Sequence, residues 1–303
     1  KSEEEVVKVW NTDKLDEAIG LFPKECVYMR WKYEDATTPA HRRLLEWYHD
    51  KGLKVMGATA ASAGDSPFMP RRNTRSEYVK GFSQLVADNQ LEGILATAWD
   101  DGSPHLETVW RGFIAQGEFE AFKKAHAQRE YGFRPEDNRM AFLDELEKAV
   151  FFFDGALVTS GRRNPAWGTT AFTLMELPDK TKPGAWSELY KDKIAQAKIE
   201  AGRYEKIVQG IRTAEAEALR NRYTLQVYEQ TNNLQNYPVR LILALNAYDT
   251  AKDDAAREAA LEKVAEVCSY FDVMRSNLQS VYSETRFMEP PEGFISDLNH
   301  HNH

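Results

Sequence analysis

The sequence has few cysteines, no long apolar run and no block of basic residues. No apolar run approaches the ~20 residues that a membrane-spanning helix needs, so we expect no membrane span. The net charge is −8, which together with the missing basic block argues against nucleic acid or an anionic membrane surface as a partner. We find no internal repeat and no low-complexity tract.

The two cysteines, Cys26 and Cys268, lie far apart in the sequence and form no metal-type pair. Cys26 falls in an expected strand and Cys268 on the apolar face of an expected helix. We therefore expect both to be buried as small apolar side chains rather than reactive thiols, and a disulfide between them stays open. The sequence begins at Lys1 without Met or an apolar leader, so we expect a processed or truncated product.

The first 120 residues alternate strand-like and helix-like segments. The expected strands are Val6–Trp10, Cys26–Trp31, Lys54–Thr59 and Gly93–Trp99. The expected helices are Asp13–Phe22, Pro39–Lys51 and Arg75–Asn89. Strands that alternate with helices predict parallel βα units. Four such units are half of an eight-stranded barrel and cannot close alone, so we expect a missing N-terminal half or another cover for the open edges.

Residues 121–303 have a different, helical pattern. Arg139–Phe152 has an apolar helical stripe, and residues 154–187 are rich in glycine and proline. Three long helices are expected at 186–222, 223–250 and 253–285, with Pro238 kinking or interrupting the second. Their apolar spacing favours a bundle with short connections. We therefore predict an α/β domain over residues 1–120 and a separate all-α domain over residues 121–303.

The most informative segment, residues 93–113, combines an apolar strand, a polar loop and a helical pattern. Trp99, Asp100 and Asp101 lie where that strand ends. In β/α barrels, substrate-binding groups project from strand ends. An aromatic face for stacking and carboxylates for hydroxyl groups are what a sugar site needs. The alternative is a βα loop in which Asp100 or Asp101 caps the next helix.

A second pair of aromatic residues, Trp31 and Tyr33, alternates on one side at the end of another expected strand. They could line a binding site at that strand end, or pack in the core between strand and helix. Arg71-Arg72 could contact an anionic or hydroxyl-rich ligand, but we expect a solvated loop. His105 lies near the proposed site, and we expect it to be structural or on the surface. His300, His301 and His303 lack a second ligand cluster, so we predict no metal site. We expect no cofactor.

The segment around Trp99 resembles the last barrel strand and the following helix of family 20 glycoside hydrolases, the β-N-acetylhexosaminidase family. That family has Trp and an acidic residue two positions later, places that Trp99 and Asp101 fill, although Glu is more common at the second. Residues 27–33 resemble the sixth strand, residues 54–60 the seventh and Val6–Trp10 the fifth. The resemblance covers roughly the first 120 residues and implies the C-terminal part of a (β/α)8 TIM-type barrel.

The resemblance implies an exo-acting hydrolase for carbohydrates with a terminal N-acetylhexosamine. It implies that Trp99, Asp101, Trp31, Tyr33 and Asp100 bind substrate, and it suggests an exported protein. The family's catalytic Asp-Glu pair follows the fourth strand, which this register places before Lys1.

Asp16-Glu17 is a poor substitute for that pair, because its segment has a helical pattern with both carboxylates on the solvated side. We therefore assign no catalytic residue and expect the chain alone to hydrolyse nothing. The alternative is a non-catalytic carbohydrate-binding or interaction module.

Overall fold

A computed structural model describes residues 12–62, 73–98, 106–117, 121–161 and 172–285. Over these residues the chain is mostly helical with a small parallel sheet. The mixed α/β class expected from the sequence is thereby confirmed. The chain divides into two compact units, and residues 123–303 all belong to the second.

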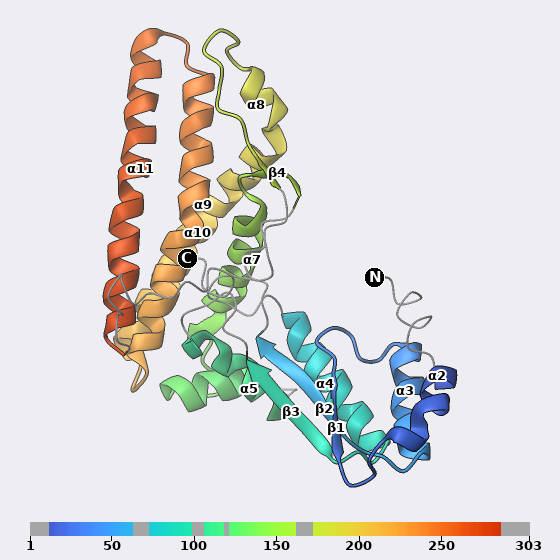
Figure 1. The fold of residues 1–303 in the computed structure, drawn as a ribbon. Helices are drawn as coiled ribbons and strands as arrows, with labels where there is room; N and C mark the ends of the chain where they lie inside the picture. Colours follow the sequence, from blue (N-terminus) through green and yellow to red (C-terminus); the bar gives the residue numbers. More distant parts are fainter. Residues whose placement is uncertain (1–11, 63–72, 99–105, 118–120, 162–171, 286–303) are drawn as a thin grey trace, which may run out of the picture. The chain divides into compact units, whose positions relative to one another are not determined.

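The first unit contains three strands and the helices that alternate with them (Figure 1). Its elements are α2 (Thr12–Ala18), the 3-10 helix η1 (Ile19–Leu21), β1 (Val27–Trp31), α3 (Pro39–Asp50), β2 (Lys54–Ser62), α4 (Asn73–Asp88), β3 (Gly93–Ala98) and α5 (Trp110–Gly117). The short segments η2 (Leu106–Val109), α6 (Phe122–His126) and the π-helical turn η3 (Ala127–Tyr131) fall almost entirely in the second unit.

The second unit continues with long helices and one hairpin. Its elements are the 3-10 turn η4 (Arg139–Ala141), α7 (Phe142–Gly155), β4 (Val158–Gly161), β5 (Phe172–Leu174), α8 (Ala185–Leu189), α9 (Lys191–Glu217), α10 (Arg222–Asp249) and α11 (Asp254–Ser283).

The sheet of the first unit is parallel and keeps the order β1-β2-β3. Met29 pairs with Met56, and Ala58 lies between Trp31 and Leu95. All three strands were expected from the sequence, and their parallel βα arrangement is confirmed. The fourth expected strand, Val6–Trp10, lies outside the described residues.

Helices cover one face of this sheet (Figure 1). Helix α3 begins with Pro39, whose fixed φ and missing N–H suit the first helical turn. Helix α4 lies against β2, where Gly57 permits a close approach: a Cβ on Gly57 would be 2.9 Å from the Val86 Cγ2 atom. Phe82 of α4 is fully buried in this layer. The opposite face of the sheet is therefore the one that carries the candidate site.

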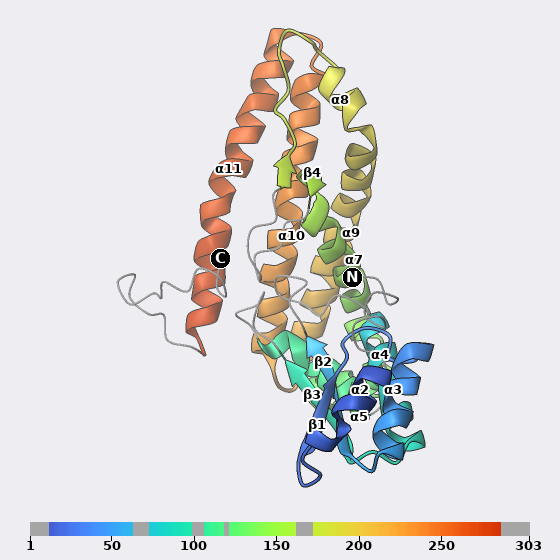
Figure 2. The ribbon, with the colours of Figure 1, turned by 45° about the vertical axis from the view of Figure 1, so that its right-hand side comes forward.

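The second unit is a bundle in which α7, α9 and α10 enclose an apolar core, and α11 lies along α10 (Figure 2). Short connections join α9 to α10 and α10 to α11, as expected. Helix α11 starts at Asp253, whose carboxylate accepts a 2.8 Å hydrogen bond from the Ala256 N–H. Its buried residues recur every seven positions, at Ala260, Val267 and Met274, which is the spacing of a coiled-coil seam.

Several expectations for the second unit were wrong. A β-hairpin, β4–β5, falls in the region expected to be loop. The first long helix is divided at Tyr190 into α8 and α9. The sequence predicted a kink or an interruption at Pro238, and the interruption is missing: α10 is continuous and buries this proline. Neighbouring turns and packing offset the single hydrogen bond that a proline removes.

Both cysteines were expected to be buried, and both are exposed. Cys26 lies in the turn before β1, where its N–H bonds the Pro23 carbonyl. Cys268 follows Val267 on α11, whose buried stripe is too narrow to include it.

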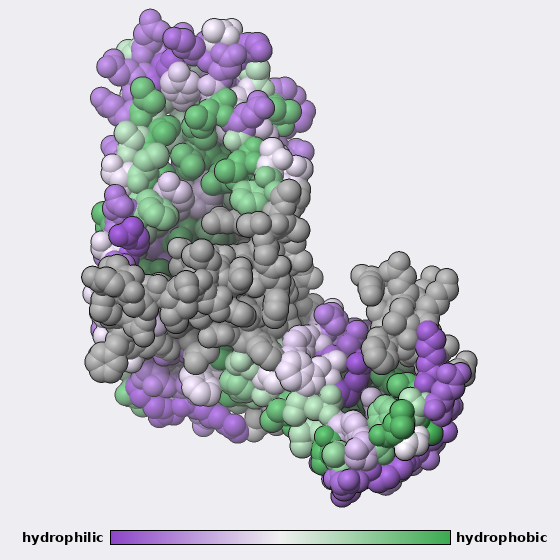
Figure 3. All heavy atoms as spheres, in the orientation of Figure 1, coloured by the Kyte–Doolittle hydropathy of each residue, from purple (hydrophilic) through white to green (hydrophobic). Residues whose placement is uncertain are grey.

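Apolar side chains also reach the surface of the bundle, over α10 and α11 in the upper part of Figure 3. Leu261 and Val273 of α11 are exposed, because this helix packs along one stripe only. No helix among the described residues is long and apolar enough to cross a membrane.

Candidate functional site

The open face of the sheet exposes a column of large apolar side chains on β1. Val27, Met29 and Trp31 alternate with Tyr28 and Arg30, which point to the helix-covered face. Alternation of this kind follows from the two-residue period of a strand. The indole of Trp31, at the last position of β1, is 46% exposed. An exposed aromatic ring at the carboxyl end of a parallel strand is positioned to contact a ligand.

Tyr33 joins Trp31 just beyond the strand. Their ring centroids are 6.0 Å apart and their planes differ by 30°, which is a stacked arrangement. The pairing of β1 with β2 extends to this point, because the Lys32 N–H donates to the Ala58 carbonyl at 3.0 Å. The structure thus brings together two of the five expected site residues.

The loop after Tyr33 is held in place by the carboxylate of Asp35. Asp35 Oδ1 accepts hydrogen bonds from the Thr37 hydroxyl at 2.6 Å and the Thr37 N–H at 2.8 Å. These bonds favour the charged carboxylate and lower the pKa of Asp35. Glu34 is exposed and lies 3.5 Å from Lys32 Nζ. Asp35 therefore fixes the turn into α3, whereas the Glu34 carboxylate faces solvent.

The centre of this sheet edge is lined by small residues. Ala58, Ala60 and Ala61 of β2 are buried, and the register shifts between Ala60 and Ser62. The Thr97 hydroxyl donates a 2.7 Å hydrogen bond to the Thr59 carbonyl, which ties β3 to β2. Trp31 and Leu95 lie on either side of Ala58 on the open face. Two large side chains thus flank a strand of small ones, and Ala58 between them is fully buried.

The remaining expected site residues, Trp99, Asp100 and Asp101, lie outside the described residues. Strand β3 ends at Ala98, immediately before Trp99 in the sequence. Their assignment to a sugar site therefore stays a prediction. Arg71-Arg72, His105 and the histidines of the C-terminal tail also lie outside the described residues.

The pair that the sequence excluded from catalysis, Asp16 and Glu17, is exposed on α2, as expected. Asp16 Oδ1 accepts hydrogen bonds from Lys51 Nζ at 2.6 Å and from the Trp47 indole at 2.8 Å. The hydrogen bond from Lys51, followed by that from Trp47, lowers the pKa of Asp16. Its carboxylate anchors α2 to α3, which is a structural role.

Within the described residues, no group of three or more His, Cys, Asp or Glu side chains is arranged to hold a metal ion. No protein-family model and no curated protein matches the chain.

Sequence reasoning missed a polar layer inside the bundle. Glu200, Asn232 and Gln235 are buried on α9 and α10, among residues expected to be apolar stripes. The signal was there: each occupies the same helix face as buried apolar neighbours such as Ala197 and Val239.

Proposed function

We propose that this chain forms the sugar-binding end of a β/α barrel similar to that of family 20 glycoside hydrolases, with β1, β2 and β3 as its sixth, seventh and eighth strands. The parallel order β1-β2-β3, which follows the sequence, supports this assignment. The observation that carries the proposal is the stacked Trp31–Tyr33 pair on the exposed face at the end of β1.

In this proposal the aromatic residues recognise an N-acetylhexosamine. The faces of Trp31 and Tyr33 provide apolar surface for the sugar ring and the acetamido methyl group. If the alternation of β3 continues by one residue, Trp99 shares the open face with Leu95 and Thr97. Asp101, and Asp100 beside it, would then accept hydrogen bonds from sugar hydroxyls, since an ionised carboxylate is a strong acceptor.

The reaction implied by the resemblance is substrate-assisted: the acetamido oxygen attacks the anomeric carbon as the glycosidic bond to the leaving group breaks, and an oxazolinium intermediate forms. A Glu general acid and the Asp before it complete the machinery in that family. We assign neither to this chain, because Asp16 and Glu17 lie on helix α2 and the Asp16 carboxylate is engaged by Lys51 and Trp47. The proposed role of the chain is therefore to bind and orient the sugar.

Isothermal titration of the full chain with a thiazoline derived from N-acetylglucosamine tests this role. We expect saturable binding that is tighter than for N-acetylglucosamine itself, because the thiazoline mimics the intermediate. Equal binding of both would favour a simple carbohydrate-binding module instead. Release of N-acetylglucosamine from an aryl glycoside by the chain alone would refute our placement of the general acid.

A further inference from the structure

A polar layer crosses the helical bundle between two apolar clusters. One cluster includes Leu146 of α7, Ile207 of α9 and Tyr228 of α10. The other includes Ala197 of α9 and Ile242 of α10. Between them on α9 and α10 lie the polar residues Glu200, Asn232 and Gln235, all buried. A buried polar layer is costly unless its hydrogen-bonding groups are satisfied.

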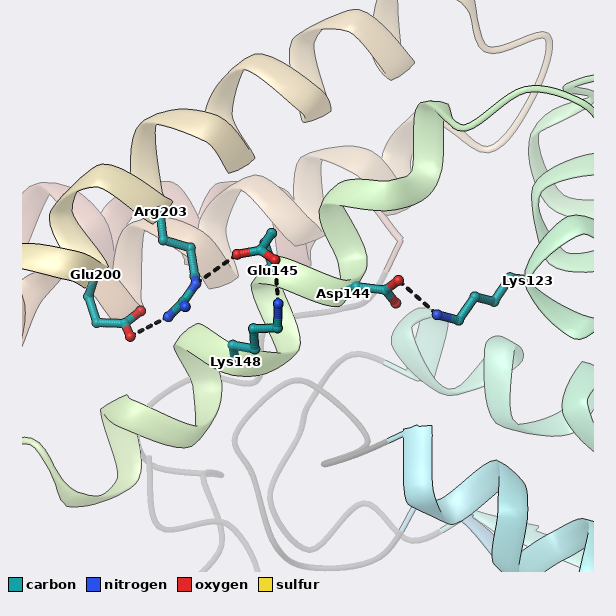
Figure 4. A network of polar contacts seen from close by, with 6 residues as sticks. All are labelled: Lys123, Asp144, Glu145, Lys148, Glu200 and Arg203. Atoms are coloured by element: carbon teal, nitrogen blue, oxygen red, sulfur yellow. Dashed lines mark hydrogen bonds and ion pairs between the residues drawn. The ribbon is translucent and has the colours of Figure 1, made fainter. Parts of the chain in front are cut away.

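Glu200 is only half satisfied by the protein. Its side chain is 2% exposed, and its Oε1 atom accepts hydrogen bonds from Arg203 and, at 2.6 Å, from Gln196. Arg203 also forms an ion pair with Glu145 of α7, at 2.9 Å. Glu145 forms a second ion pair with Lys148 (Figure 4). The Oε2 atom of Glu200, by contrast, has no hydrogen-bond partner among the described residues. The ion-pair chain therefore accounts for the charge of Glu200 but leaves one buried acceptor.

Gln235 faces the same space from α10. It is 4% exposed, and in the described part of the chain neither its Nε2 nor its Oε1 atom has a partner. Glu200 and Gln235 both line a cavity of about 10 Å³ at this level. Tyr204 and Asn232 add polar lining, and Ala149 and Val239 add apolar lining. Three unmatched polar atoms thus belong to the walls of one small cavity.

We propose that this cavity is a binding site for a single internal water molecule, held by Glu200 and Gln235. The volume is about what one water needs, and buried waters make about three hydrogen bonds to groups of this kind. Water can donate to Glu200 Oε2 and accept from Gln235 Nε2. A cation would leave Nε2 without an acceptor, and an anion would be repelled by the Glu200 carboxylate.

This water would connect α9 to α10 at a fixed level. Two helices that meet only through apolar side chains can slide along each other at little cost. A buried polar group that loses its partner when the helices slide is left unsatisfied. The hydrated layer therefore fixes the register of the two helices, in the way that buried polar residues do in coiled coils.

A high-resolution crystal structure of the full chain tests the site directly. We expect one solvent peak 2.7–3.2 Å from both Glu200 Oε2 and Gln235 Nε2, which is ordinary hydrogen-bond geometry. The absence of a peak, a direct contact between the two side chains, or a peak ligated only by oxygens at shorter, metal-like distances would overturn the proposal.

Thermal unfolding of Gln235→Met gives a second test. The sign of the change in Tm depends on whether a water molecule satisfies the Gln235 amide or the amide is left unsatisfied. If water satisfies the amide, methionine removes a bridge and leaves Glu200 Oε2 unmatched, and we expect Tm to fall by about 2–4 °C. If the amide is unsatisfied, methionine relieves a burial penalty and Tm rises or stays unchanged, which would overturn the proposal. The matched control is Gln209→Met, at an exposed position of α9, for which we expect no change.

Discussion

At the residue scale, hydrogen-bond partners and solvent exposure distinguish carboxylates with a structural role from side chains that could bind a ligand. Asp16 and Asp35 each accept two hydrogen bonds from neighbouring residues, so their carboxylates are committed to holding loops and helices. Trp31 instead presents nearly half of its surface to solvent at a strand end. Exposed aromatic surface of this kind costs hydration free energy unless a ligand or another surface covers it.

Substitution of Trp31 with alanine tests its role in binding. We expect binding of the thiazoline to weaken by roughly 1–3 kcal/mol, by analogy with aromatic stacking on nucleic acid bases. Trp110→Ala is the matched control, because Trp110 is 47% exposed but lies on α5. Isothermal titration of both variants measures the difference, and equal losses would place Trp31 outside the site.

The sequence predicted the burial of single residues correctly at some positions and wrongly at others. The helical pattern around Leu15 correctly placed Asp16 and Glu17 on the solvated side of a helix. The same kind of reasoning failed for Cys26 and Cys268, because apolar periodicity does not state how wide the buried stripe is. On α11 that stripe is one residue wide in each heptad, which only the packing of α11 against α10 determines.

At the element scale, close contacts between helices depend on glycines that the sequence pattern does not distinguish. A Cβ on Gly210 of α9 would lie 2.6 Å from the Phe142 Cβ atom of α7. A Cβ on Gly202 of the same helix would meet nothing within 4 Å. The two glycines therefore have opposite expected responses to alanine.

We expect Gly210→Ala to destabilise the protein by about 1–3 kcal/mol through overpacking against α7. Gly202→Ala, its control, should stabilise by roughly 0.5–1 kcal/mol, since alanine restricts the unfolded chain and favours helix. Urea unfolding followed by circular dichroism measures both. Loss of stability in Gly202→Ala as large as in Gly210→Ala would contradict the close approach of α7 and α9.

A second element-scale prediction concerns the ion pairs that join α7 to α9. Hydrogen bonds from Lys148 and then from Arg203 lower the pKa of Glu145 below its ordinary value of 4.5. The stabilisation is therefore fully present above pH 4.5 and is lost as the pH falls through the lowered pKa of the folded state. Because Glu145 is partly exposed, we expect about 0.5–1 kcal/mol.

Thermal unfolding of the wild type and of Glu145→Gln between pH 7 and pH 3 checks this. The wild type should have the higher Tm at pH 7, and the difference should shrink below pH 4.5. A difference that stays constant over this range would show that the lowered pKa contributes nothing to stability.

The elements themselves followed well from the sequence, and their exceptions have local causes. The apolar patterns predicted β1, β2, β3, α10 and α11 to within a few residues, whereas the first long helix expected at 186–222 is divided into α8 and α9. The hairpin β4–β5 was missed because its strands are short and exposed, so that no apolar alternation marks them. Pro238 was overweighted, because buried packing around α10 keeps the helix continuous.

At the scale of the whole molecule, the chain contains two units with separate cores. We expect a substitution in one core to affect mainly the unit that contains it. Gly112→Ala is suitable, because its Cβ would lie 2.6 Å from the Ala61 carbonyl oxygen in the first unit. Hydrogen exchange should show faster exchange in β1–β3 and unchanged protection in α9–α11. Equal loss of protection in both would show that the units unfold together.

The candidate site depends on how helices pack against the sheet, which the apolar pattern of the sequence does not predict. That Trp31 and Tyr33 share one side followed from their two-residue spacing, but their stacking and the open face that exposes them follow only from the packing of the folded chain. The burial of Glu200 and Gln235 was missed although the helical period places both on the apolar faces of α9 and α10. That both residues line one cavity follows only from how the two helices pack.

The most direct test of the central claim is the affinity of the full chain for the N-acetylglucosamine thiazoline, measured by titration before and after Trp99→Ala. We predict saturable binding by the wild type and a loss of roughly 1–3 kcal/mol in the variant, with Trp110→Ala unchanged. An absence of binding by the wild type, or an affinity that Trp99→Ala does not alter, would contradict a sugar site at the carboxyl ends of these strands.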